Sequence, residues 1–119
     1  MRKDGVLRNQ RDFDQVYRKG KSVPSRHVVI FYRRTRRPET RIAFLASKKV
    51  GNSVKRNRAR RLMRAALRNS GIQLEPGVDY IFIARNSITG AKCPEVEKSL
   101  MSAFRRMGGA KNEGRRKRH

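Results

Sequence analysis

The arginine-rich segment between residues 48 and 68 holds the side chains best suited to bind another molecule. Asn57, Arg61, Arg64 and Arg68 recur at spacings of four, three and four, which place them on one face of a helix. Like charges at such spacings destabilise an isolated helix by about 0.2–0.5 kcal/mol per pair, and no Asp or Glu interrupts the segment. A face exposed only to water would alternate its charges, so the pattern indicates an anionic partner.

Arginine rather than lysine dominates this face, which narrows the chemistry of the contact. A guanidinium group forms paired hydrogen bonds with phosphates and base edges, whereas an ammonium group acts as a point charge. The free N–H groups at the start of the helix also favour a phosphate near Lys48 and Lys49. The predicted contacts to the anionic partner are Lys48, Lys49, Asn52, Arg56, Asn57, Arg58, Arg60, Arg61, Arg64 and Arg68.

Composition indicates that this partner is a nucleic acid. The 119-residue chain has 32 Lys and Arg against nine Asp and Glu, a formal net charge of +23, and an anionic partner relieves the resulting self-repulsion. A membrane is a poorer candidate, because no apolar run approaches the roughly 20 residues of a spanning helix and no secretory signal is visible. The one cysteine, Cys93, excludes an intramolecular disulfide and a cysteine-cluster metal site. We therefore expect a single cytoplasmic domain.

Three aromatic residues form a second candidate site. Phe13 and Tyr17 lie one turn apart in a predicted helix, and Phe31 lies in an apolar run that predicts a strand. Bases of single-stranded RNA stack on exposed rings with little regard to sequence. The alternative is that Phe13 and Tyr17 bury their face in the core together with Val16. His27 is expected on the surface of a strand.

Helices and strands must hold these side chains in place. Asn9 suits an N-cap and Gly20 suits a helix end, which together delimit a first helix. Two apolar runs on either side of Pro38 predict a hairpin. The predicted elements are a helix at 10–19, strands at 21–23, 27–34 and 40–47, a helix at 54–70, a strand at 78–85 and a helix at 93–107.

This order predicts an α/β sandwich, an α+β domain in which three helices pack on a mixed four-stranded sheet. The strand, helix, strand segment from Arg41 to Arg85 fits a parallel crossover, for which the default hand is right. From Gly108 onward no residue suits a core, so residues 108–119 are predicted to be a flexible basic tail.

The spaced basic residues also form an extended motif, KK-x-G-x-x-x-x-R-N-R-x-[KR]-R-L-x-R. It is matched by Lys48, Lys49, Gly51, Arg56, Asn57, Arg58, Arg60, Arg61, Leu62 and Arg64. At these residues the chain resembles the protein subunit of bacterial ribonuclease P, and the likeness extends from about Leu7 to Met107. Two residues depart from the pattern, since Ala43 stands where Gly is usual and Ala59 where a larger aliphatic residue is usual.

The resemblance implies a fold, a function and partners. The fold, over residues 1–107, would be ribosomal protein S5 domain 2-like, with a left-handed crossover against the general rule. The subunit would bind the catalytic RNA through the arginine helix and the 5′ leader of precursor tRNA in a cleft, for which Phe13, Tyr17 and Phe31 are the candidates. The RNA, with its bound Mg²⁺ ions, would cut the leader. The resemblance further implies a protein monomer in a 1:1 complex with the RNA.

Two other functions remain open. A structural RNA-binding protein, such as a ribosomal protein, would have the same size and charge but would not require the spaced motif together with the aromatic helix. A protein-only nuclease would require clustered acids, whereas the nine acids are scattered along the chain. No nucleophile with its base, carboxylate pair or metal-ligand cluster stands out in the sequence, so no catalytic residue is predicted.

Overall fold

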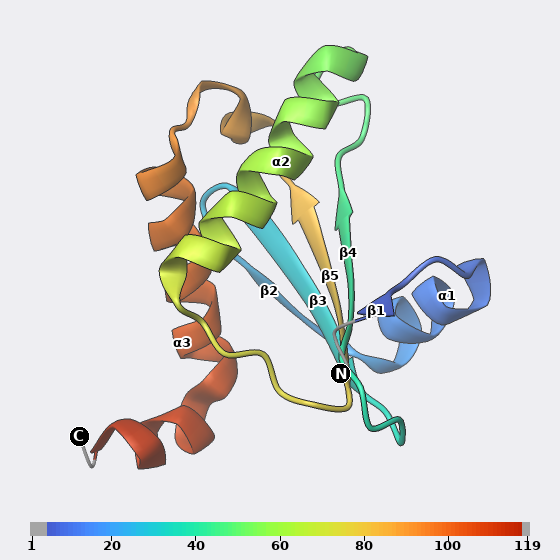
Figure 1. Cartoon of the computed structure of the whole chain (residues 1–119), viewed down its shortest axis with the longest axis vertical. Coiled ribbons are helices and arrows are strands. Elements are labelled where there is room, and N and C mark those ends of the chain that lie inside the picture. Colours follow the sequence, from blue (N-terminus) through green and yellow to red (C-terminus); the bar gives the residue numbers. More distant parts are fainter. Residues whose placement is uncertain (1–4, 118–119) are drawn as a thin grey trace.

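The computed structural model describes the backbone of residues 5–117 and the side chains of residues 5–108. Within this part of the chain, three α-helices and a five-stranded sheet make one domain (Figure 1). The elements are β1 Gly5–Val6, α1 Gln10–Lys19, β2 Lys21–Pro24, β3 Val28–Arg34, β4 Arg41–Leu45, α2 Ser53–Ser70, β5 Val78–Ala84, the 3₁₀ helix η1 Asn86–Gly90 and α3 Cys93–Lys117. The predicted fold class is confirmed, with one strand more than expected.

The strands run in the order β1-β4-β5-β3-β2, which corrects the predicted hairpin. β3 and β4 do not pair with each other, because β5 lies between them, antiparallel to β3 and parallel to β4. β5 is apolar on both faces apart from Asp79, and all its residues except Ile83 are buried. A strand buried on both faces belongs at the centre of a sheet. The additional strand, β1, has only two residues, too few for a periodic signal.

The β4–α2–β5 unit is the predicted parallel crossover, and its hand is left. In Figure 1 both strands point up the page, α2 lies in front of the sheet, and β5 lies to the left of β4. A right-handed crossover seen from this side would have its second strand on the right. The structure therefore agrees with the resemblance and not with the general rule.

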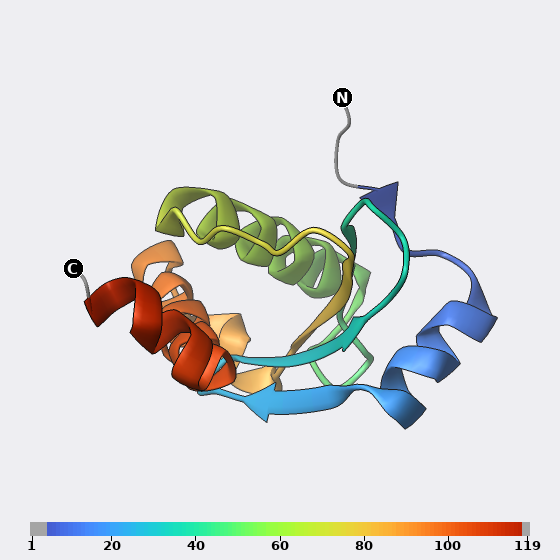
Figure 2. The ribbon, with the colours of Figure 1, turned by 90° about the horizontal axis from the view of Figure 1, so that it is seen from below.

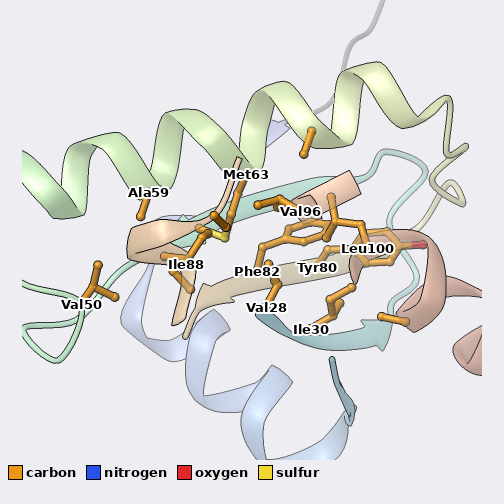
Figure 3. Packing of buried hydrophobic residues seen from close by; sticks show 14 of the residues in the cluster. Val28, Ile30, Val50, Ala59, Met63, Tyr80, Phe82, Ile88, Val96 and Leu100 are labelled. Atoms are coloured by element: carbon orange, nitrogen blue, oxygen red, sulfur yellow. The ribbon is translucent and has the colours of Figure 1, made fainter. Parts of the chain in front are cut away.

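Helices cover both faces of the sheet (Figure 2). α2 and α3 pack on one face, where Met63, Phe82 and Leu100 are completely buried in the larger core (Figure 3). α1 packs on the other face through Val16, which is also completely buried beside Ile81. α2 and α3 thus bury their apolar sides against the same face of the sheet.

The helix ends follow local capping chemistry. The side chains of Asn9 and Asn52 each accept a backbone N–H of the first turn of α1 and of α2. Gly71 ends α2 with φ of 75°, a left-handed conformation that glycine adopts without steric cost. These three residues explain why the predicted bounds of α1 and α2 agree closely with the structure.

α3 runs from Cys93 to Lys117, whereas the sequence predicted its end at Met107. Val96, Leu100 and Ala103 recur at spacings of four and three, form the inner face of this helix and are completely buried. The side chains of residues 109–119 lie outside the described residues. The boundary at residue 107 and the flexible tail at 108–119 therefore stay predictions.

Candidate nucleic-acid interface

The outer face of α2 presents most of the predicted contacts to solvent. Ala59, Met63 and Ala66 point into the core, which turns the opposite side of the helix outward. No arginine of α2 forms an ion pair with an acid in the described part of the chain. Asn57, Arg58, Arg61, Arg64 and Arg68 are exposed, and Arg56 and Arg60 are half-buried.

The turn before α2 brings two lysines to the start of the helix. Lys48 and Lys49 are exposed, and the backbone N–H of Gly51 donates to the carbonyl of Lys48 at 3.1 Å. The Asn52 side chain accepts the backbone N–H of Lys55 at 3.0 Å. Asn52 therefore caps the helix, while the two lysines add charge at its positive end.

Arg58 differs from the other arginines of α2, because its guanidinium group donates to backbone carbonyls outside the helix. It donates to the carbonyl oxygen of Thr89 at 3.3 Å and to that of Ala91 at 3.0 Å. The Thr89 hydroxyl in turn donates to the carbonyl of Val50 at 3.2 Å. Arg58 thus connects α2 to η1, and Thr89 connects η1 to the turn that carries the lysines.

Two more arginines of α2 contact residues of the protein, one within the helix and one on β4. Arg60 donates to the side-chain oxygen of Asn57. The guanidinium carbon of Arg64 lies 5.2 Å from the centroid of the Phe44 ring, within the range of a cation–π contact. Arg64 is nonetheless exposed, so its outer edge stays available to an anion.

The three predicted aromatic residues come together on the other face of the sheet. The ring of Tyr17 lies edge-on to Phe31 at 4.9 Å between centroids and is stacked with Phe13 at 6.5 Å. Tyr17 is 41% exposed, whereas Phe13 and Phe31 are half-buried. Partial burial, with the charge of Asp14 nearby, raises the pKa of Tyr17, so its hydroxyl stays protonated at neutral pH. Val16 alone is fully buried, so neither of the two alternatives describes all the residues of this helix face.

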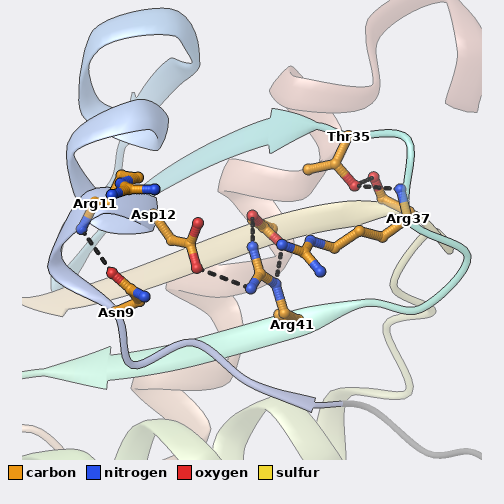
Figure 4. Close-up of polar contacts among 8 residues, drawn as sticks. Asn9, Arg11, Asp12, Thr35, Arg37 and Arg41 are labelled. Atoms are coloured by element: carbon orange, nitrogen blue, oxygen red, sulfur yellow. Dashed lines mark hydrogen bonds and ion pairs between the residues drawn. The ribbon is translucent and has the colours of Figure 1, made fainter.

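A buried ion-pair network, which the sequence did not predict, holds α1 against the sheet (Figure 4). Arg41 on β4 donates to both carboxylate oxygens of Asp79 on β5, at 3.0 and 2.7 Å, and to Asp12 on α1 at 2.9 Å. The Asp79 side chain is 1% exposed. Hydrogen bonds to Asp79 are the largest of the effects that raise the pKa of Arg41. The only sequence signal is an aspartate inside an otherwise apolar strand.

His27 is buried rather than on a strand surface, so that expectation was wrong. It is 7% exposed, belongs to the β2–β3 connection and contacts η1 through Ser87 and α3 through Ser99. The Ser87 hydroxyl donates to the carbonyl of Arg26 at 2.9 Å and therefore accepts from Nδ1–H of His27 at 3.0 Å. Burial is the main cause of the lowered pKa of His27, and the charge of Arg26 adds to it.

The described residues contain no group of three His, Cys, Asp or Glu side chains placed to hold a metal ion. Asp12, Glu75 and Asp79 are instead paired with arginines. In the same part of the chain, no helix is long and apolar enough to cross a membrane. The chemical features that the surface does offer are the basic face of α2 and the aromatic cluster beside α1.

Comparisons with known proteins agree with this geometry. The family model described as Ribonuclease P matches residues 1–108. The ribonuclease P protein component of Pelotomaculum thermopropionicum is 39% identical over 101 residues, 85% of this chain and 90% of its own length. That of an Exiguobacterium species is 38% identical over 118 residues, 97% of this chain and 100% of its own length.

Solved structures agree as well. The ribonuclease P protein of Staphylococcus aureus is 27% identical, has a TM-score of 0.75, and is aligned over 87% of this chain and 94% of its own. That of Thermotoga maritima is 24% identical with a TM-score of 0.73, over 88% of this chain and 97% of its own, a likeness of fold. With the match over residues 1–108, these findings show that the chain belongs to the ribonuclease P protein family.

Proposed function

We propose that the chain binds the catalytic RNA of ribonuclease P through the outer face of α2 and assists endonucleolytic removal of the 5′ leader from precursor tRNA. The observation that carries the proposal is the row of exposed arginines at Arg61, Arg64 and Arg68, which faces solvent without an acidic partner in the described residues. Arginines in such a row neutralise successive phosphates of a folded RNA.

In the proposed division of labour, the RNA supplies the reacting groups and binds the Mg²⁺ ions, which provide charge stabilisation at the phosphate. The protein neutralises phosphate charge and positions the substrate. Asp12, Glu75 and Asp79, which could bind a cation, are each paired with an arginine, so the proposed role of the protein does not depend on them as metal ligands. One protein monomer joins one RNA.

The leader of precursor tRNA is assigned to the aromatic cluster formed by Phe13, Tyr17 and Phe31. Tyr17 offers the most accessible ring, and the edge-on contact with Phe31 fixes its orientation. This cluster lies on the face of the sheet opposite α2, so the leader and the catalytic RNA would occupy different faces of the protein. The protein would thereby hold the two RNAs in a fixed relation.

The placement of the RNA on α2 is tested by changing Arg61 and Arg64 to Ala together. Loss of two phosphate contacts should weaken assembly with the RNA and lower the slope of log affinity against log salt by about 2. The measurement is a titration of the RNA with protein at several salt concentrations. Arg105, an exposed arginine of α3, supplies the matched control.

The Arg105→Ala variant should bind with nearly the affinity and slope of the unchanged protein. If substitution of Arg61, Arg64 and Arg105 lowers the salt slope equally per charge removed, the RNA is attracted by the overall charge of the protein. In that case the RNA does not bind specifically to α2. Unchanged affinity in the Arg61→Ala, Arg64→Ala variant would refute the placement directly.

A further inference from the structure

A groove of about 720 Å³ runs along the open edge of the sheet, between α2 and β1. Its floor is apolar and includes Phe44 and Leu67, and its rim includes Val6, Arg64 and Arg68. Small-ligand sites typically have about 300–1,000 Å³ and an apolar lining. The groove therefore has the size and lining of a binding site, and it adjoins the basic face of α2.

The floor of the groove also offers unpaired backbone groups. Gly5 and Leu7 donate to the carbonyls of Thr40 and Ile42, so alternate residues of β4 direct their hydrogen-bonding groups to this edge. By the same alternation, the backbone N–H and C=O of Phe44 also point to this edge. The pairing of β1 with β4, however, covers only Arg41 and Ile42. Within residues 5–117, Phe44 has no strand partner on this side. One N–H and one C=O therefore face the groove.

The charges around the groove have a single sign. Arg64 and Arg68 are both exposed, and no Asp or Glu is among the described residues that line the groove. The Arg64 guanidinium lies across the ring of Phe44, at 5.2 Å from its centroid. An occupant must therefore have an anionic group that binds the arginines. It must also have a flat apolar part with polar edges that fits the floor. A nucleotide has this combination.

We propose that the groove takes one unstacked nucleobase of the ribonuclease P RNA, with its phosphate on Arg64 and Arg68. The base lies on the exposed Arg64 guanidinium and against Leu67, because the Phe44 ring is itself covered by Arg64 and Phe82. Its polar edge meets the free backbone groups of Phe44. This inference rests on the proposed function, since it assumes that α2 covers that RNA. The bound base would add a contact that depends on the shape of the groove, in addition to the phosphate contacts made by the outer face of α2.

The test fills the groove without changing the charge. Val6 is 61% exposed and Gln73 is exposed in the loop after α2, so a Trp at either position narrows the groove with little effect on the core. Met101→Trp is the matched control, because Met101 is 43% exposed on α3 and does not line the groove. Each variant is titrated with the ribonuclease P RNA at several salt concentrations, and its thermal unfolding is measured alone.

Val6→Trp and Gln73→Trp should each weaken RNA binding roughly tenfold at every salt concentration, the loss expected for one stacked base. The slope against log salt should stay that of the unchanged protein, whereas Arg64→Ala should lower it by about 1. Met101→Trp should bind as the unchanged protein does. If both groove variants bind normally, or if their slope falls, no base enters the groove.

A second measurement identifies the occupant. A photoreactive benzophenone amino acid at position 6 should cross-link to a nucleotide of the RNA in the assembled complex. A cross-link to the protein's own residues 1–4 in the presence of RNA, or to a second protein chain, would overturn the proposal. Failure of the unchanged protein to bind the RNA would instead refute the proposed function itself, so the two failures are distinguishable.

Discussion

Phe13 and Tyr17 occupy successive turns of α1, yet they differ in how far they face solvent. Tyr17 is 41% exposed, while Phe13 is half-buried beside the smaller core. Because both rings contact each other and Tyr17 contacts Phe31, the cluster combines a packing role with an accessible surface. The two roles are separable by measuring folding and leader binding on the same variant.

Changing Phe13 and Tyr17 to Ala together should weaken binding of precursor tRNA to the holoenzyme roughly tenfold, because one stacked base is lost. Binding of mature tRNA, which has no leader, should be unchanged. The measurement is the ratio of the two dissociation constants, with thermal unfolding of the variant as the check on folding. Equal losses for both tRNAs would show that the rings serve only the core.

His27 should make stability depend on pH. Burial lowers the pKa of His27, so the folded protein holds the ring neutral while the unfolded chain takes up a proton near pH 6.5. The contribution of the neutral His27 to the free energy of unfolding is therefore fully present above about pH 6.5. It is lost as the pH falls from about 6.5 to below the lowered pKa of the folded state. Urea unfolding between pH 5 and 8 should show a difference between unchanged protein and His27→Gln that shrinks toward acid. A difference independent of pH would contradict this.

For single residues, the sequence predicts exposure to solvent better than it predicts contacts with other residues. Helical periodicity placed Arg61 and Arg64 on the outer face of α2, and both are exposed. That Arg58 binds the carbonyls of Thr89 and Ala91 depends on where η1 lies, which no local pattern encodes. Arg41 meets Asp79 only because β4 pairs with β5 in that register. The aromatic cluster was foreseen as a set, but the exposure of each ring was not.

Among the elements, α1 depends on a polar contact for its position on the sheet. Val16 supplies its completely buried contact, and Arg41 joins Asp12 of the helix to Asp79 of the central strand. A bidentate pair with a buried carboxylate fixes the guanidinium rigidly. The third hydrogen bond, to Asp12, therefore orients the helix that carries Phe13 and Tyr17.

Replacing Asp12 with Asn should disturb leader binding without removing an aromatic ring. The charged hydrogen bond from Arg41 is weakened, which costs about 1 kcal/mol of stability and lets α1 shift on the sheet. We expect the preference for precursor over mature tRNA to fall severalfold. The measurement is again the ratio of the two dissociation constants.

Asp14→Asn is the matched control, since Asp14 lies on the same helix, is exposed, and is bonded only to Gln10 among the interactions described. Both substitutions remove one negative charge, which by itself favours binding of any RNA. Asp14→Asn should therefore leave the preference unchanged while slightly raising both affinities. Equal behaviour of the two variants would show that Asp12 acts only through its charge.

The elements themselves were largely predictable, but their pairing was not. Capping residues such as Asn9, Asn52 and Gly71 act locally, so the sequence locates the helix ends well. The hairpin prediction failed because it assumed that consecutive strands pair, whereas β5 enters between β3 and β4 from later in the chain. The left hand of the crossover opposes the general rule, so only the resemblance to the family indicated it.

For the whole molecule, the central quantity is the charge. A net charge of +23 on 119 residues opposes the compact state, and RNA binding relieves that repulsion. The fold places the arginine row on one face of the sheet and the aromatic cluster on the other. This arrangement supports the proposed role, in which the protein holds the catalytic RNA on one face and the leader of precursor tRNA on the other.

The most direct test of this account is cleavage of precursor tRNA at low Mg²⁺. Under these conditions we expect the ribonuclease P RNA alone to cleave poorly, because its phosphates repel those of the substrate. Adding the protein should restore cleavage at the mature 5′ end, and the protein without RNA should not cleave. An RNA that the protein fails to stimulate, or cleavage by the protein alone, would contradict the proposed function.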